Sequence, residues 1–232
     1  MLNKNVVNIL GQVQKITNSV VLRYPVTIAN APAGDVLVSL NVKGLDSDEF
    51  EDIGIYNLGE FLDTFKLFDE REVEINDDII TVSHDNMSLQ YISNNINLLQ
   101  EFDKPVSIFE KTEEVPTVSE FVLEVDDIKK IKQASGIFKD LTEVALKSQD
   151  SDMNIYLSGS NKFNAKSNSF KLIKESNSNK EFEVRIPIDN FSKLPLSNYN
   201  VIVKYNQSRD AYRVLFYSTE IEDFKVLMAV KK

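Results

Sequence analysis

The predicted architecture is built around one stretch of the chain, Val125-Asp-Asp-Ile-Lys-Lys-Ile-Lys-Gln-Ala-Ser-Gly-Ile-Phe-Lys139. Ile128, Ile131, Ser135 and Phe138 follow one another at positions i, i+3, i+7 and i+10. Because an α-helix turns once in about 3.6 residues, this spacing places these apolar or small side chains on one narrow face. The sequence therefore predicts a helix over 126–138 that packs through this face.

The opposite face of this helix is basic, because three lysines point away from the apolar face: Lys129, Lys130 and Lys132. Asp126 is a suitable N-cap, Asp127 suits the positive end of the helix dipole, and Lys139 suits its negative end. The chain itself is acidic, with 26 Lys and Arg against 36 Asp and Glu and a net charge of -10. A solvated helix face would explain one such cluster, so a functional interpretation requires that the pattern recur.

A second amphipathic helix is predicted over residues 3–17. Its apolar face is formed by Val6, Ile9, Leu10, Val13 and Ile16. Its polar face is formed by Asn5, Asn8, Gln12 and Lys15. Residues 1–34 contain no Asp or Glu, whereas Lys4, Lys15 and Arg23 are present. A surface of amides and lysines without carboxylates suits a position near phosphate groups.

Short alternating segments bounded by turn residues predict many β-strands, and their order with the helices repeats. In each half a long helix and several strands are followed by a short helix, at 58–68 and 189–193, and then by three strands. The strands are predicted at 20–23, 26–29, 36–42, 53–56, 72–75, 79–83, 87–92, 121–125, 143–148, 154–157, 169–174, 182–186, 199–205, 212–217 and 224–230.

This repeat predicts an α+β fold of two similar domains, each built from antiparallel sheets with two short helices on one face. We expect an N-terminal domain at 1–104 and a C-terminal domain at 120–232. Residues 105–119 contain two prolines and no sustained hydrophobic period, so they are interpreted as the interdomain connector.

Few residues support an enzyme. His84, the only histidine, lies in a predicted hairpin turn without an evident partner for proton transfer. The seven glycines form no phosphate-binding loop. The acidic runs at 46–52 and 150–152 are interpreted as solvated turns, because the spacing of a calcium loop is missing. We therefore expect no catalytic site, no metal and no cofactor.

The chain has no Cys, which removes disulfides and thiol chemistry and fits a reducing compartment. No apolar run approaches the ~20 residues that a membrane-spanning helix needs. Asn residues interrupt the apolar character of the N-terminus, so no signal peptide is expected there. These features favour a soluble cytoplasmic protein.

Three stretches, taken in order, resemble the sliding clamps of tailed bacteriophages, which are ring-shaped processivity factors of DNA polymerases. Residues 55–62 resemble the strand that leads into the second helix of the family's first domain. Residues 125–136, followed by 154–162, resemble the first helix and the following strands of its second domain. Residues 191–199 resemble its last helix, where a Lys precedes a turn and a Tyr opens the next strand.

The resemblance implies a head-to-tail ring, a homotrimer of two-domain subunits, with helices lining the hole and sheets forming the outer wall. Duplex DNA would pass through the hole without being cut or read. A clamp loader would open and close the ring, and the DNA polymerase and other replication proteins would dock on one face, near the interdomain connection. For a viral protein, the location would be the cytoplasm of the bacterial host.

On this resemblance, lysines on four helices are candidates for contacts with DNA: Lys4, Lys15, Lys66, Lys129, Lys130, Lys132 and Lys193. The second helix departs from the pattern, because Glu60 and Asp63 outweigh Lys66 there. The candidate partner-binding residues lie in the connector and at the end of the chain: Val106, Ile108, Phe109, Met228 and Val230.

Two other interpretations stay open on the sequence. A non-enzymatic, β-rich structural or interaction protein of a virus would carry the same strands, with helix lysines that are merely solvated. For the candidate partner-binding residues, the alternative is that they are ordinary interdomain core, because isolated apolar residues in a connector mostly pack locally. An enzyme built on acidic residues is the other alternative, and the absence of Cys and of a phosphate-binding loop disfavours it.

Overall fold

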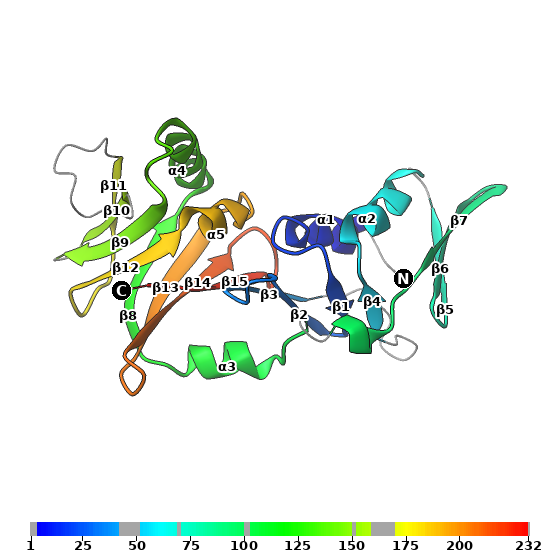
Figure 1. The fold of residues 1–232 in the computed structure, drawn as a ribbon, viewed down its shortest axis with the longest axis horizontal. Helices are drawn as coiled ribbons and strands as arrows, with labels where there is room; N and C mark the ends of the chain where they lie inside the picture. The colour runs from blue at the N-terminus through cyan, green and yellow to red at the C-terminus, as the bar shows by residue number, and fades with distance from the viewer. Residues whose placement is uncertain are drawn as a thin grey trace. The chain divides into compact units, whose positions relative to one another are not determined.

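The computed structural model describes residues 4–41, 52–68, 71–99, 103–149, 152–158 and 170–231. The chain divides into two compact units, Met1–Ile108 and Phe109–Lys232. The division falls inside the segment 105–119 that the sequence predicts as an interdomain connector. Figure 1 shows the helices and strands of both units.

The first unit contains helices α1 (Lys4–Val13) and α2 (Leu58–Lys66) and a 3-10 helix, η1 (Ile96–Leu99). Its strands pair antiparallel, β1 with β4, β2 with β3, and β5 with β6 and then β7. They span β1 (Val20–Leu22), β2 (Val26–Asn30), β3 (Val36–Asn41), β4 (Ile53–Ile55), β5 (Glu72–Asn76), β6 (Ile79–His84) and β7 (Met87–Ile92).

The core of the first unit lies between these helices and strands. α1 buries Val6, Leu10 and Val13, which are three or four residues apart and therefore share one face of the helix. α2 buries Phe61, whose ring meets that of Tyr91 in β7 edge-on, with the two ring centres 5.1 Å apart. This aromatic contact seats α2 on the sheet of β5, β6 and β7.

The second unit contains α4 (Val125–Ile137), α5 (Ile188–Lys193) and most of α3 (Ser107–Glu113), whose first two residues belong to the first unit. Its strands form two antiparallel layers, in the orders β15-β14-β13-β8 and β11-β10-β9-β12. In Figure 1, α4 and α5 lie on one side of the strands of this unit and α3 lies on the other. The strands span β8 (Thr117–Leu123), β9 (Glu143–Gln149), β10 (Asp152–Ser158), β11 (Lys171–Glu175), β12 (Phe182–Pro187), β13 (Tyr199–Asn206), β14 (Ala211–Ser218) and β15 (Lys225–Ala229).

The α+β prediction with antiparallel sheets is confirmed, and a strand lies in every segment predicted as one. The predicted helices are also present, although the one expected over 3–17 ends at Val13. α3 was not predicted. It has only seven residues, of which Phe109 and Thr112 are buried, so it is too short to show a helical period. Among the described helices, none combines the length and the apolar character needed to cross a membrane.

Candidate nucleic-acid interface

α4, the helix that the sequence predicts over 126–138, packs on the second unit through one face. Ile128 and Ile131 are fully buried, and Ala134 is nearly so. Ser135 and Phe138, which the sequence assigns to the same face, are only half-buried. The contact face therefore runs along Ala134 more than along Ser135, and the opposite side of the helix faces solvent.

A capping contact fixes the beginning of α4. The backbone N–H of Glu124 donates to Oδ2 of Asp127 at 3.0 Å, and Glu124 is the N-cap. The prediction that Asp126 caps the helix was therefore wrong. The Asp127 side chain is 8% exposed and also pairs with Lys174 of β11 at 2.8 Å, whereas that of Asp126 is 70% exposed. Only the Asp127 carboxylate points inward, so only it can bind both the backbone N–H of Glu124 and the Lys174 side chain of β11.

The three lysines of α4 have different environments. Lys129 and Lys130 are exposed, and Lys129 pairs with Asp126 at 3.1 Å. Such an exposed pair contributes little to stability. Lys132 is half-buried, and its Nζ donates to the backbone carbonyl of Leu194 at 2.6 Å. Leu194 is the C-cap of α5, so this hydrogen bond joins α4 to α5.

The short helix α5 carries the next candidate cation, Lys193, at its last position. Asn190 and Phe191 are buried and hold the helix on the sheets. Lys193 itself is half-buried. Because Lys193 immediately precedes Leu194, the hydrogen bond from Lys132 places the end of α5 beside α4. A lysine of α4 therefore lies next to the end of α5, the helix that carries Lys193.

In the first unit α1 and α2 also lie in contact. Asn18, which follows α1, binds the beginning of α2. Its backbone carbonyl accepts from the N–H of Leu58 at 2.7 Å, and its Oδ1 accepts from the N–H of Gly59 at 3.2 Å. Since the first N–H groups of a helix have no partner within the helix, these bonds complete the N-terminus of α2 and fix it against α1.

The candidate lysines of the first unit are exposed where their side chains are described. Lys15 lies in the turn after α1 and donates to the side chain of Gln12 at 2.7 Å. Lys66 ends α2 and pairs with Asp63 at 2.8 Å, in agreement with the acidic character noted for this helix. Lys4 is the first residue of α1, and its side chain lies outside the described part of the structure.

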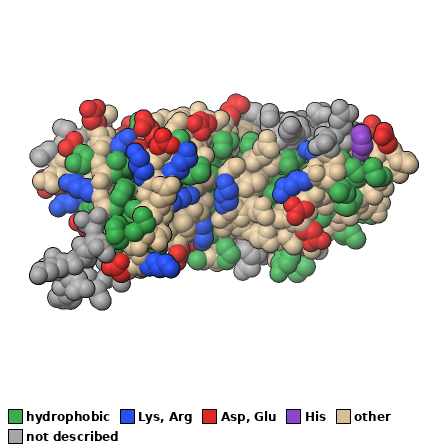
Figure 2. Space-filling model, turned by 90° about the horizontal axis from the view of Figure 1, so that it is seen from above, with side chains coloured by type: hydrophobic (Ala, Val, Ile, Leu, Met, Phe, Trp, Pro, Cys, Tyr) green, Lys and Arg blue, Asp and Glu red, His purple; other side chains and the backbone are tan. Residues whose placement is uncertain are grey.

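Figure 2 looks onto the side of each unit on which α1 and α2, or α4 and α5, lie in Figure 1. Lys and Arg side chains are spread over this side, and Asp and Glu side chains lie among them. The cations therefore do not merge into one continuous basic patch. Such a surface supports many weak phosphate contacts better than one tight binding site.

The candidate partner-binding residues are not all accessible. Val106 is 40% exposed, and Ile108 and Val230 are half-buried. Phe109 and Met228 are 3% and 0% exposed, so their side chains belong to the core. Val106 and Ile108 belong to the first unit and the other three residues to the second.

A polar network that the sequence did not predict holds α3 on the strands of the second unit, on the side opposite α4 and α5 (Figure 1). One carboxylate oxygen of Glu113, Oε1, accepts from Nζ of Lys225 at 2.7 Å and from the hydroxyl of Tyr217 at 3.0 Å. The backbone carbonyl of Glu113 accepts from Nζ of the buried Lys204 at 2.8 Å. These partners come from β13, β14 and β15 and lie 91 to 112 residues from Glu113 in sequence. A local sequence pattern therefore cannot predict the contact.

The charges of this network control the ionisation of Glu113. Partial burial of the carboxyl acts to raise its pKa. The hydrogen bonds from Lys225 and Tyr217 and the positive charges of Lys225 and Lys204 outweigh that effect and hold the pKa of Glu113 below its usual value. Burial and the neighbouring Glu113 carboxylate raise the pKa of Tyr217, which remains a hydrogen-bond donor.

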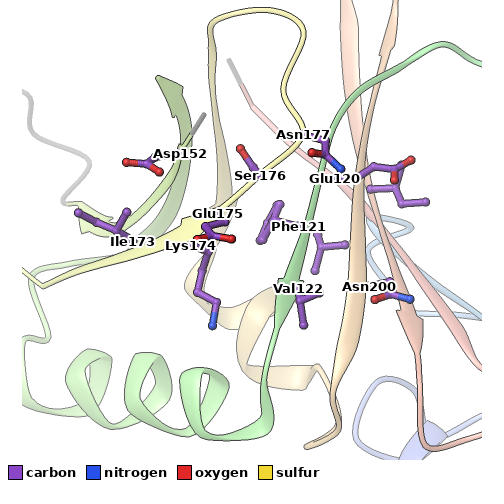
Figure 3. A pocket seen from close by; sticks show the side chains of 12 residues that line it. Glu120, Phe121, Val122, Asp152, Ile173, Lys174, Glu175, Ser176, Asn177 and Asn200 are labelled. Atoms are coloured by element: carbon purple, nitrogen blue, oxygen red, sulfur yellow. The ribbon is translucent and has the colours of Figure 1, made fainter. Parts of the chain in front are cut away.

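A groove of about 1060 Å³ lies in the second unit between β8 and β11, which are end strands of the two layers. Figure 3 shows Val122 on β8 and Ile173 on β11, whose side chains are 49% and 53% exposed. Glu120 and Glu175 add negative charge to the lining. Lys174 points instead toward α4, in keeping with its pair with Asp127.

The acidic runs contribute no described metal site. Residues 46–51 and 150–151 lie outside the described residues, and Asp52 pairs with Arg23 at 2.9 Å. Within the described ranges, no three His, Cys, Asp or Glu side chains gather in a way that could hold a metal ion. His84 ends β6 beside the turn at Asp85.

Solved structures resemble this chain over nearly its whole length. The proliferating cellular nuclear antigen of Entamoeba histolytica matches with a TM-score of 0.68 and 14% identity, covering 97% of this chain and 94% of that chain. The A. fulgidus PCNA bound to the C-terminal region of FEN-1 matches with a TM-score of 0.66 and 13% identity, covering 97% and 94%. The β chain of DNA polymerase III from Streptococcus pneumoniae matches with a TM-score of 0.66 and 12% identity, covering 97% of this chain and 63% of that chain.

No protein-family model and no curated protein matches the sequence. The similarity is therefore one of structure, and it extends through both units. The chain has the fold of a sliding clamp.

Proposed function

We propose that this protein is a sliding clamp, which encircles duplex DNA and tethers the replicative DNA polymerase and other replication proteins. The observation that carries the proposal is the match to clamp structures over 97% of the chain. The role that we propose is non-enzymatic: the protein would hold its partners on DNA without a cofactor. We place it among the clamps of tailed bacteriophages, acting in the cytoplasm of the bacterial host, on the sequence resemblance alone.

The helices of both units would face the DNA in this proposal. Lys4 belongs to the candidate set, and its six other lysines lie on or next to these four helices with described side chains: Lys15, Lys66, Lys129, Lys130, Lys132 and Lys193. Lysine contacts with phosphates carry no sequence preference and weaken steeply with salt. The remaining surface, with a net charge of -10 for the chain, would repel DNA. Encirclement, and not tight binding, would then keep the protein on DNA.

A closed ring requires a head-to-tail contact between copies, and we propose a homotrimer. Candidate edges are β7 in the first unit and β11 in the second, each the end strand of its sheet. Ile92 on β7 is 70% exposed and Ile173 on β11 is 53% exposed. Natural sheets seldom leave such apolar edges uncovered, so pairing of β7 of one copy with β11 of the next would protect both.

Replication partners, including the polymerase and a clamp loader, would dock on one face of the ring. The A. fulgidus structure, a clamp bound to the C-terminal region of FEN-1, supports docking through a terminal peptide segment. Val106, Ile108 and Val230 are the candidate residues that retain some exposure. Phe109 and Met228 would support such a pocket from below, because both are buried.

Retention on circular DNA tests the proposal directly. The protein is loaded onto nicked circular DNA with its clamp loader, and the complex is isolated by gel filtration at about 0.3 M salt, where direct phosphate contacts are weak. We expect retention on the circle and release once a restriction enzyme linearises it. Equal retention on circular and linear DNA would reject encirclement.

The same measurement addresses the second candidate, a β-rich structural or interaction protein of a virus. Such a protein has no reason to distinguish circular from linear DNA. Exposed strand edges favour self-association in either case, so assembly alone does not separate the two functions.

A further inference from the structure

Lys132 differs from the other lysines of α4 in what its ammonium group binds. Nζ of Lys132 lies 2.6 Å from the carbonyl oxygen of Leu194, which is 62 residues away in sequence and fully buried. Lys132 is itself half-buried, whereas Lys129 and Lys130 extend into solvent. The ammonium is thus directed along the protein toward α5.

The acceptor of this hydrogen bond is well suited to a cation. Leu194 is the C-cap of α5, where carbonyl groups lack partners within the helix and the helix dipole is negative. The next residue, Pro195, has no backbone N–H. A charge-assisted hydrogen bond to such a carbonyl is shorter and stronger than one between neutral groups.

The helix that this bond holds depends on tertiary contacts. α5 has only six residues, and a helix of that length is not stable by itself in water. Phe191 anchors its buried side, and the bond from Lys132 anchors its C-terminal end. Lys193 lies immediately before that end, so the position of its ammonium group depends on where the end is held.

We infer that Lys132 is a positioning residue that fixes the end of α5 against α4 and so sets the position of Lys193, and that Lys132 does not itself bind DNA phosphates. The part of this inference that concerns DNA rests on the proposed function. The part that concerns the two helices does not, and it is tested in the absence of DNA.

The first experiment measures hydrogen exchange of the Leu194 amide, which donates to the carbonyl of Phe191 at the end of α5. Lys132→Met keeps the aliphatic chain and removes the donor, and we expect about tenfold faster exchange, the effect of losing one charge-assisted hydrogen bond. Lys132→Arg keeps a cationic donor and should restore most of the protection. Lys130→Met makes the same change in charge two residues earlier in α4, where the side chain is exposed. In this control the Leu194 amide should exchange at the wild-type rate. Wild-type exchange in Lys132→Met would overturn the inference.

The second experiment is a double-mutant cycle on binding to a short duplex at low salt. If Lys132 acts through α5, Lys132→Met weakens binding in the wild-type background but has little further effect once Lys193→Met is present. The matched cycle of Lys130→Met with Lys193→Met should be additive, because each side chain contacts its own phosphate.

Additive losses for Lys132 and Lys193, with the salt slope falling by about 0.9 for each, would show that Lys132 contacts phosphate directly and would overturn the inference. If no variant and no wild-type protein binds DNA, the proposed function fails. In that case the exchange experiment still decides whether Lys132 holds α5.

Discussion

At the scale of single residues, Gly54 shows how the absence of a side chain sets local packing. It lies in β4, opposite Val21 of β1, and its carbonyl accepts from the N–H of Asn94 at 2.7 Å. A Cβ atom at this position would overlap the carbonyl oxygen of Asn94 and approach the side chain of Leu99. The Asn94 carbonyl is backbone and is held next to β4 by the hydrogen bond from Asn94 to Gly54, and Leu99 is buried, so neither can move aside easily.

We therefore predict that Gly54→Ala lowers the free energy of unfolding by about 1–3 kcal/mol, the usual cost of overpacking. Gly11→Ala is the matched control, because Gly11 lies in α1 with open space where its Cβ would be. The control should be neutral or up to about 1 kcal/mol more stable, since alanine favours helix. Chemical denaturation of both variants measures the difference, and equal stabilities would contradict the prediction.

At the scale of elements, α3 depends on the strands beneath it. Arg213 of β14 donates to the hydroxyl of Thr112 at 2.8 Å, and Lys225 of β15 and Lys204 of β13 hold Glu113. A helix of seven residues gains little from its own hydrogen bonds, so these contacts and the buried Phe109 determine where it lies. The attachment is ionic in part and should therefore respond to pH.

We predict that Glu113→Gln destabilises the protein at neutral pH but not in acid. The pKa of Glu113 is lowered in the folded protein, so its ionised form stabilises the fold above the unfolded value of 4.5, and this contribution is lost as the pH falls through the folded value. At pH 7 we expect a loss of about 0.5–1 kcal/mol, because the pair is partly exposed and screened by solvent.

Unfolding of both proteins between pH 7 and pH 3 measures this effect, and the gap between them should close below about pH 4.5. Glu110→Gln is the control, because Glu110 is exposed on the same helix. A gap that stays constant down to pH 3 would show that the charge of Glu113 does not hold α3.

At the scale of the whole molecule, the acidic charge and the exposed strand ends act in opposite directions. A net charge of -10 on each copy opposes association. The exposed apolar side chains on the edge strands, Ile92 of β7 and Ile173 of β11, favour association. For the proposed ring to form, the contact between these strands must outweigh the repulsion, and added salt should assist assembly by screening it.

We predict a native mass of three chains of 26.4 kDa each. Ile173→Asp places a charge on the β11 edge and should shift the protein to monomers. Ile137→Asp is the control, because Ile137 is 73% exposed at the end of α4, away from any sheet edge. Native mass spectrometry or sedimentation measures the mass. A wild-type monomer, or a trimer that survives Ile173→Asp, would reject the proposed contact.

The sequence by itself determined the fold class and the order of the strands and of the four helices α1, α2, α4 and α5. Helical and strand periods are local, so Ile128 and Ile131 on one face of α4, or alternation along β8, are visible without knowledge of the fold. The same local reasoning found the exposed lysines, Lys129 and Lys130, because a polar residue opposite an apolar face points to solvent.

Only the tertiary structure decided which partner each polar group has. In the structure Glu124, and not Asp126, caps α4, and Lys132 binds the carbonyl of Leu194. α3 forms although it was not predicted, and Phe109 and Met228 are buried in the core. Each of these outcomes depends on contacts that folding brings together from distant parts of the chain or on the direction in which a side chain points into the core. Such contacts have no period along the chain, and so they leave no signal that sequence patterns can carry.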